Sequence, residues 1–216
     1  MTEVVIKRPL HIAVFCKPPI AGQVKTRLIP EYGAEGATRI YLQLAERTMQ
    51  TVRAACAALD AEASLWVAGN TSHPVVLDWA NRFSLPIVQQ SAGDLGAKMH
   101  DCLATLARGH ERVLLVGTDC PALDVDHLQT ATTALTPDCP WVFAPAEDGG
   151  YVLAGSNHPS AAPFRNIDWS TTKVMTQTRA ALLAHALAWK ELDTLWDVDE
   201  ATDVKRALAA GLLNSH

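Results

Sequence analysis

The chain has 216 residues, 49% of them hydrophobic and 19% charged, so it can bury a large core and is not expected to be disordered. Its net charge of −5 argues against general nucleic-acid binding, and no apolar run reaches the roughly 18 residues of a membrane span. The length suits a single domain over residues 1–216 and is short for two.

Short apolar runs alternate with helical patterns along the chain. Several of these runs are continuous rather than alternating, which is typical of strands that are covered on both faces. The predicted strands are His11–Cys16, Ser64–Ala68, Leu85–Gln89, Arg112–Gly117, Trp141–Ala144 and Tyr151–Ala154, with a last strand within Thr194–Val198.

The clearest predicted helix runs from about Gly33 to Leu59, because apolar side chains recur there at three- and four-residue spacing. Asp124 and Ser170 stand where an N-cap would accept hydrogen bonds from free backbone N–H groups. Further helices are predicted at Val75–Phe83, Ala97–Arg108, Val125–Leu135, Thr171–Ala186 and Ala201–Leu208. The alternation predicts a mainly parallel α/β sheet, which binds ligands at the carboxyl ends of its strands.

Neither export nor a cysteine-based site is indicated. Residues Met1–Arg8 contain no apolar segment with a small-residue cleavage site. The cysteines are widely spaced, without a C-x-x-C pair, so the sequence favours neither a disulfide framework nor a zinc site. We expect buried free thiols in a reducing cytoplasm, at Cys16, Cys56, Cys102, Cys120 and Cys139.

The loop after the first predicted strand suits a phosphorylated ligand. Gly22 permits a tight turn, and Lys25, Thr26 and Arg27 then supply two positive charges and a hydroxyl, with Lys25 expected to be exposed. The spacing does not fit a Walker A loop, and no G-x-G-x-x-G motif occurs in the chain. A solvated basic turn is the alternative interpretation.

Carboxylates follow two of the predicted strands. Asp119 comes after the buried run that ends at Gly117, and Asp197 and Asp199 lie at the end of the last predicted strand. Carboxylates of this kind, together with substrate phosphates, are the ligands that Mg²⁺ prefers. Alternatively, Asp119 caps a turn with Pro121, and Asp199 caps the following helix, which leaves Asp197 as the better ligand candidate.

A third acidic segment links two strands. Asp148 precedes the pair Gly149 and Gly150, where the backbone could approach a ligand. An Asp-Gly pair is also a hairpin signal, and the two interpretations are compatible. Asp148 is the candidate general base, because its carboxylate stands beside this accessible backbone.

Two weaker patterns open predicted helices. Gly93 and Asp94 precede a helix whose first turn carries Lys98, so free N–H groups could meet an anion there. The second pattern begins at Trp169, just before the helix predicted at Thr171–Ala186. Trp169 could stack on a ligand ring or lie in the core. It is followed by the hydroxyl residues Ser170 and Thr171.

Taken in order, these motifs resemble the DUF2064 family of small bacterial proteins. The family is placed among the nucleotide-diphospho-sugar transferases, and some members are assigned to arsenosugar biosynthesis. The resemblance covers roughly residues 11 to 208. It rests on Lys17-Pro18-Pro19 through Leu28, Gly93 to Met99, Gly117 to Pro121, Pro145 to Tyr151, Trp169-Ser170-Thr171, and Asp197-Val198-Asp199.

The resemblance implies a GT-A-like three-layer α/β/α sandwich and kinship with guanylyltransferases of the phospholactate and molybdopterin type. It implies that the loop of Lys25 and Arg27 holds nucleotide phosphates. Asp119 would bind Mg²⁺ or Mn²⁺, with Asp197 or Asp199 as a second ligand. The chain departs from the family pattern in Lys98, where Arg is usual, and in Cys120, where Ser is frequent.

The site expected from these motifs has four parts. The catalytic candidates are Asp148 and Asp119, and the metal candidates are Asp119, Asp197 and Asp199. The nucleotide or phosphate candidates are Gly22, Lys25, Thr26, Arg27, Gly93, Asp94 and Lys98. The substrate candidates are Gly149, Gly150, Trp169, Ser170 and Thr171.

The function favoured by the sequence is a cytoplasmic glycosyltransferase that uses a nucleotide-diphosphate sugar, a divalent cation and a small-molecule acceptor. A nucleotidyltransferase that uses a nucleoside triphosphate, or a non-catalytic nucleotide-binding protein, is the alternative. A phosphatase of the haloacid-dehalogenase type is disfavoured, because the Asp197–Thr202 segment has the wrong spacing and follows the wrong strand. The sequence indicates neither the sugar, the base, the acceptor nor the oligomeric state.

Overall fold

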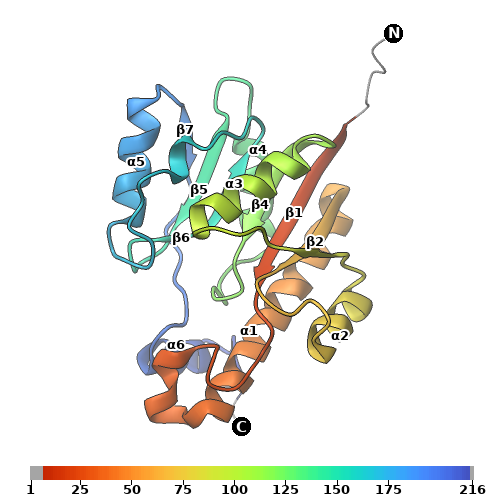
Figure 1. Ribbon diagram of the computed structural model, residues 1–216, viewed down its shortest axis with the longest axis vertical. Helices are drawn as coiled ribbons and strands as arrows, with labels where there is room; N and C mark the ends of the chain where they lie inside the picture. Colours follow the sequence, from red (N-terminus) through yellow and green to blue (C-terminus); the bar gives the residue numbers. More distant parts are fainter. Residues whose placement is uncertain (1–6, 215–216) are drawn as a thin grey trace.

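The computed structural model describes residues 7–214, in which a seven-stranded sheet lies between two layers of helices (Figure 1). The strand order is β3-β2-β1-β4-β6-β5-β7. β6 runs antiparallel to β4 and β5, and the other neighbouring strands pair in parallel. The expected three-layer α/β/α sandwich is therefore confirmed. Residues 1–6, most of the segment in which no export signal was found, lie outside the described residues.

The elements alternate as the sequence predicts. The strands are β1 (Arg8–Cys16), β2 (Ala61–Val67), β3 (Ile87–Gln89), β4 (His110–Val116), β5 (Trp141–Pro145), β6 (Tyr151–Ser156) and β7 (Trp189–Glu191). The helices are α1 (Ile29–Leu59), α2 (Pro74–Phe83), α3 (Leu95–Leu106), α4 (Val125–Ala134), α5 (Val174–Ala184) and α6 (Ala201–Ala209), with short 3-10 turns η1 (Thr26–Leu28) and η2 (Ala162–Phe164).

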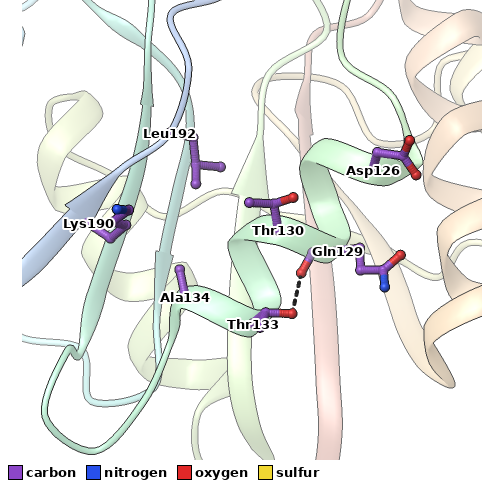
Figure 2. A pocket seen from close by; sticks show the side chains of 7 residues that line it. All are labelled: Asp126, Gln129, Thr130, Thr133, Ala134, Lys190 and Leu192. Atoms are coloured by element: carbon purple, nitrogen blue, oxygen red, sulfur yellow. Dashed lines mark hydrogen bonds between the residues drawn. The ribbon is translucent and has the colours of Figure 1, made fainter.

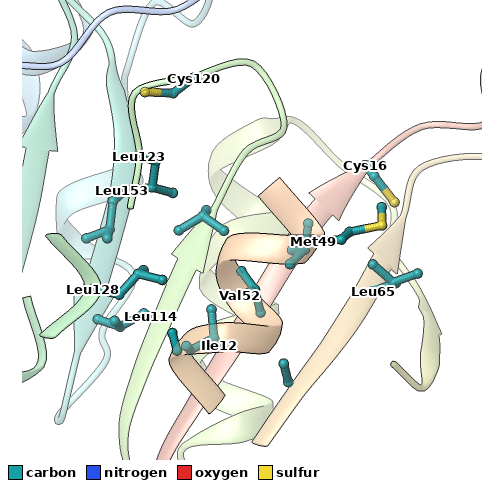
Figure 3. Close-up of a cluster of buried hydrophobic side chains, with 14 of the residues drawn as sticks. Ile12, Cys16, Met49, Val52, Leu65, Leu114, Cys120, Leu123, Leu128 and Leu153 are labelled. Atoms are coloured by element: carbon teal, nitrogen blue, oxygen red, sulfur yellow. The ribbon is translucent and has the colours of Figure 1, made fainter. Parts of the chain in front are cut away.

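Each face of the sheet has its own apolar core. On one face, Ile12 of β1 and Leu114 of β4 pack against α1 and α4, among the side chains labelled in Figure 3. On the other face, Trp66 and Phe143 pack with residues of α3, η2 and α5. Strands buried on both faces need apolar side chains at successive positions, which explains their continuous apolar runs.

The last predicted strand is wrong. Thr194–Val198 contains no strand, and Leu195 forms a single β-bridge with Ala146. The seventh strand is β7, a three-residue edge strand beside β5 that contains Lys190 and Glu191. A short, charged edge strand carries no apolar run. Leu195 and Val198 are buried without belonging to the sheet, so their apolar character misled the sequence interpretation.

The structure tests three residues that the sequence offers as helix N-caps. Asp124 is the N-cap of α4, as predicted, and accepts a hydrogen bond from the His127 N–H. Ser170 does not cap a helix, because α5 begins at Val174 and Ser170 has a left-handed φ of 63°. The N-cap of α6 is Glu200 rather than Asp199, so the Asp199 carboxylate is available to other partners.

Free thiols were expected at all five cysteines, and the structure contains no disulfide between them. Cys16, Cys102 and Cys120 are buried, whereas Cys56 and Cys139 are half-buried. Within residues 7–214, no helix combines the length and the apolar character that crossing a membrane requires.

The sheet order creates a crevice at one edge. β2, which follows β1 in the chain, lies on one side of β1, and β4 lies on its other side, so the strand order reverses at β1. Ligands bind at such switch points in open α/β sheets. Because β6 is antiparallel, its first residues and the β5–β6 turn reach the same edge.

The β5–β6 turn packs tightly against the segment that leads into α5. The Met175 N–H donates to the Gly149 carbonyl over 2.8 Å, and Gly149 has a φ of 90°. A Cβ atom added to Gly149 would lie 2.3 Å from the Thr172 carbonyl oxygen. Glycine is therefore required there both for the backbone conformation and for the close approach.

We predict that Gly149→Ala destabilises the fold more than Gly211→Ala. Gly211 also has a left-handed φ, of 67°, but a Cβ there meets no atom within 4 Å. Gly211→Ala should cost about 1–2 kcal/mol for the left-handed conformation alone. Gly149→Ala should cost about 1–3 kcal/mol more, because the backbone of Thr172 must move. Urea unfolding of the two variants measures the difference, and equal losses would contradict the prediction.

Candidate functional site

A cleft of about 810 Å³ opens at the carboxyl edge of the sheet. It is formed by the ends of β1 and β4, the beginning of β6, and the loops that follow β2, β3 and β5. Of the candidate residues named from the sequence, all but Gly22 and Gly149 line it. Gly22 shapes the turn of the first loop with a φ of 81°, and Gly149 packs against Thr172.

Lys25 lines this cleft. Its ammonium contacts Asp119 Oδ1 at 2.8 Å and Asp199 Oδ1 at 3.1 Å. The Lys25 side chain is 5% exposed, so the expectation of an exposed loop lysine is wrong. Lys25 also has a left-handed φ of 47°, a conformation that a non-glycine residue keeps only when its surroundings enforce it.

The charge of Lys25 is fixed by these two neighbours. Burial disfavours the ammonium, but the nearby carboxylates of Asp119 and Asp199 outweigh it and raise the pKa of Lys25 above its usual value. Arg27 Nη1 contacts Asp199 Oδ2 at 3.0 Å, and the Arg27 side chain is 63% exposed. Asp199 is thus shared between both basic residues of the loop.

Three carboxylates gather beside this ion-pair network. One oxygen each of Asp148, Asp197 and Asp199 lies within 4.8 Å of the other two. Burial, and then the nearby Asp148 and Asp199, raises the pKa of Asp197 to about 6. Asp119 is not a member of this group; its carboxylate contacts Lys25, as the carboxylate of Asp199 also does. The structure therefore groups Asp197 with Asp148 and Asp199 rather than with Asp119.

Backbone hydrogen bonds hold the three acidic segments together. The Val198 N–H donates to the Asp119 carbonyl over 2.9 Å, and the Glu147 N–H donates to the Leu195 carbonyl over 3.0 Å. Asp148 Oδ1 accepts from the Gly150 N–H at 2.7 Å, which shows that the predicted hairpin turn and the acidic position coexist. These hydrogen bonds therefore hold the backbone segments that carry the carboxylates in place relative to one another.

The beginning of α3 and the segment before α5 also line the cleft. Asp94 caps α3 by accepting from the Ala97 N–H at 2.8 Å, so its carboxylate serves the helix. Lys98, in the first turn, has no ion-pair partner within 4 Å among residues 7–214. Trp169 lines the cleft and also packs on Gly96 and Tyr151. Its position is therefore compatible both with stacking on a ligand and with a role in the core.

Sequence reasoning missed residues that line the cleft by virtue of the fold. The Tyr41 hydroxyl donates to the Lys17 carbonyl and accepts from the Lys17 N–H, each over 2.9 Å, which ties the first loop to α1. Tyr41 lies on the apolar stripe of its helix, so periodicity assigned it to the core alone. Gln90 also lines the cleft, directly after β3, without a motif that marks it. Thr118 lines it too; it lies within the Gly117 to Pro121 motif but was not named as a candidate.

A second hollow, of about 440 Å³, lies between α4 and the segment around β7 (Figure 2). Figure 2 shows that Thr133 and Gln129 line it from α4, with the Thr133 hydroxyl bonded to the Gln129 carbonyl. Lys190 and Leu192 form its other side. None of the sequence-derived candidates lines it, so the larger cleft is the candidate functional site.

The two basic residues of the first loop offer a matched pair of variants. Lys25→Ala removes a buried ammonium from between two carboxylates, and the unfolding free energy should fall by about 1–3 kcal/mol. Arg27→Ala removes an exposed partner of the same Asp199, and the loss should stay below about 1 kcal/mol. Urea denaturation without ligand measures both, and equal effects would show that Lys25 does not organise the loop.

Comparison with solved structures shows a common fold. A protein from Desulfovibrio desulfuricans G20, provisionally described as a nucleotide-diphospho-sugar transferase, is 25% identical, with a TM-score of 0.80 over 96% of this chain and 89% of that chain. The 4-diphosphocytidyl-2C-methyl-D-erythritol synthase of Anaerococcus prevotii is 12% identical, with a TM-score of 0.58 over 95% and 99%.

A third similar structure is the glucosyl-3-phosphoglycerate synthase of Mycobacterium tuberculosis, solved with Mn²⁺, UDP and glucosyl-3-phosphoglycerate. It is 11% identical, with a TM-score of 0.51 over 95% of this chain and 77% of that chain. At this identity the likeness concerns the fold alone. No curated protein matches the sequence.

A family of uncharacterized proteins conserved in bacteria, DUF2064, matches residues 51–171. The matched segment includes Asp119 and Asp148, whereas Lys25 and Asp197 lie on either side of it. Because the match spans more than half of the sequence, the chain belongs to the DUF2064 family.

Proposed function

We propose that this protein is a transferase that uses a nucleotide-diphosphate sugar, bound in the cleft at the carboxyl edge of the sheet. The observation that carries the proposal is the convergence of Asp148, Asp197 and Asp199 with Lys25 and Arg27 in one cleft. Carboxylates hold a divalent cation, and basic residues bind phosphates. The similar Desulfovibrio protein supports the donor class.

The carboxylate group fits a divalent cation such as Mg²⁺ or Mn²⁺. Asp148, Asp197 and Asp199 offer three hard oxygen donors within 4.8 Å of one another. Burial, followed by the nearby carboxylates of Asp148 and Asp199, raises the pKa of Asp197, and a bound divalent cation would favour the ionised form of this group. When bound, the cation neutralises negative charge on the leaving diphosphate. Asp148 is therefore better suited to holding the cation than to the general-base role suggested by the sequence.

The basic residues bind the phosphates in this proposal. An ammonium has three donors, and Lys25 directs its contacts at Asp119 and Asp199, which leaves a donor for a phosphate oxygen. Asp119 thus acts as a positioning residue for Lys25. Thr26, Arg27 and Lys98 line the same cleft and supply further donors, and Gly93 opens the N-terminus of α3 to an anion.

The remaining wall suits the sugar and the acceptor. Gly150, Trp169, Ser170 and Thr171 also line the cleft, and they combine open backbone, an aromatic ring and two hydroxyls. Hydroxyl and amide groups form the hydrogen bonds that a sugar requires, and an aromatic face covers its apolar side.

A nucleotidyltransferase is the second candidate, because the cleft offers the same groups to a nucleoside triphosphate. Lys17, Lys25, Arg27 and Lys98 line the cleft together with five aspartates, so the lining has no surplus of positive charge that would select between the two donors. A divalent cation and the basic side chains would neutralise the phosphates of either donor. The cleft alone therefore accommodates either donor.

We predict that divalent cation and nucleotide bind with positive coupling that requires Asp197. In calorimetric titrations, Mg²⁺ should tighten nucleotide binding about 5- to 150-fold, and chelator should abolish the effect. Asp197→Asn should remove most of the coupling, because it takes one carboxylate from the group. Asp193→Asn is the matched control, since Asp193 is exposed and lies outside the group.

Two outcomes of this titration would contradict the site. One is undiminished nucleotide affinity in chelator, and the other is a normal cation response in folded Asp197→Asn protein. Circular dichroism of each variant separates loss of binding from loss of structure.

The reaction type is decided by the products. Incubation with nucleotide sugars, nucleoside triphosphates and candidate acceptors should release free nucleoside diphosphate if a glycosyl group is transferred. Pyrophosphate release would instead establish nucleotidyl transfer. Tight nucleotide binding with neither product would assign the protein to non-catalytic nucleotide binding and overturn the proposal of a transferase.

A further inference from the structure

Three potential metal ligands meet on strands that share the amino-terminal edge of the sheet. His11 on β1, Glu62 on β2 and His110 on β4 place one ligand atom each within 4.8 Å of the other two. His11 Nδ1 lies 3.3 Å from His110 Nε2, and His110 Nε2 lies 2.9 Å from Glu62 Oε2. The cleft described above opens at the opposite, carboxyl edge.

The neighbours of His110 determine where its proton lies. His110 Nδ1 is 2.9 Å from the Leu106 carbonyl oxygen, which can only accept, so Nδ1 carries the hydrogen. In a neutral His110 ring, Nε2 then has a lone pair. This lone pair faces the Glu62 carboxylate, which also has no hydrogen to donate, at 2.9 Å. Two acceptors in contact require a positive species between them.

The separation of the two imidazole nitrogens matches a tetrahedral metal site. Zn–N bonds of about 2.0–2.1 Å at tetrahedral angles place two ligand atoms about 3.3–3.4 Å apart. The separation of His11 Nδ1 and His110 Nε2 is 3.3 Å. The separation of His110 Nε2 and Glu62 Oε2 is a few tenths of an ångström shorter, and the half-exposed Glu62 side chain has room to adjust.

The surroundings orient all three side chains. Ser64 Oγ lies 2.8 Å from His11 Nε2 and accepts from the Trp66 indole N–H over 3.0 Å, which fixes the buried His11 ring. Arg8 pairs with the other oxygen of Glu62. Hydrogen bonds of this kind, made by the far side of each ligand, are the usual support of metal-binding histidines. The exposed part of Glu62 leaves an access route.

We propose that His11, Glu62 and His110 bind Zn²⁺ or a chemically similar transition-metal ion, which ties together the three adjacent strands β2, β1 and β4. Two imidazoles and one carboxylate suit such an ion, whereas the all-carboxylate group of the cleft suits Mg²⁺ or Mn²⁺. With three protein ligands, the fourth position is left to water on the exposed side of Glu62.

The test is a zinc titration of the purified chain in excess Mg²⁺, which occupies carboxylate groups without competing for imidazole. The wild-type chain should bind one Zn²⁺. Glu62→Gln and His110→Ala should each weaken binding at least about tenfold, whereas His158→Ala should not, since His158 is an exposed histidine outside the group. Glu62 is half exposed, so Glu62→Gln is not expected to unfold the protein.

Cobalt(II) identifies the ligand atoms. Bound Co²⁺ should give the visible spectrum of a tetrahedral site without the thiolate-to-metal band that the cysteines would produce. A dominant thiolate band, equal zinc affinity in Glu62→Gln, His110→Ala and wild type, or no zinc binding at all would overturn the proposal.

Discussion

The buried ammonium of Lys25 is the interaction on which the geometry of the cleft depends. It joins the loop after β1 to the loop after β4 through Asp119, and to the segment after β7 through Asp199. Burying a charge is unfavourable unless it is paired, so these contacts enforce one arrangement of three loops that are distant in sequence. The left-handed backbone of Lys25 is retained within this network.

The same network separates two sets of carboxylates that look alike in the sequence. Asp119 and Asp199 both compensate Lys25, but Asp199 is also close to Asp148 and Asp197. Asp199 thus couples the basic loop to the acidic group. A change of charge in the acidic group therefore alters the electrostatic environment of Lys25 and Arg27, because both contact Asp199.

The sequence predicts the sheet and helices well where burial imposes a continuous pattern. β1 and β4 carry continuous apolar runs at residues 12–16 and 113–116, where both faces are covered, and α1 carries a long apolar stripe. The pattern fails where burial does not require regular structure: Leu195 and Val198 are buried in an irregular segment, and the charged edge strand β7 carries no signal. Lys25 and Asp119 were found because they follow strands, whereas Asp197 and Asp199 were found after a predicted strand that the structure does not contain. How these residues pair depends on loop geometry that spacing does not encode.

The amino-terminal edge illustrates this limit most clearly. His11 and His110 stand 99 residues apart, and no short motif contains both. Parallel pairing of β1 with β2 and β4 brings His11, Glu62 and His110 together, so their association is a property of topology and register. The sheet thereby presents different donors at its two edges. Oxygen donors with basic partners lie at the carboxyl edge, where phosphates are attracted, and imidazoles lie at the amino edge, far from the loops that shape the cleft. An ion bound at the amino edge would hold β2, β1 and β4 in register, and β1 and β4 are the strands whose opposite ends carry Lys25 and Asp119.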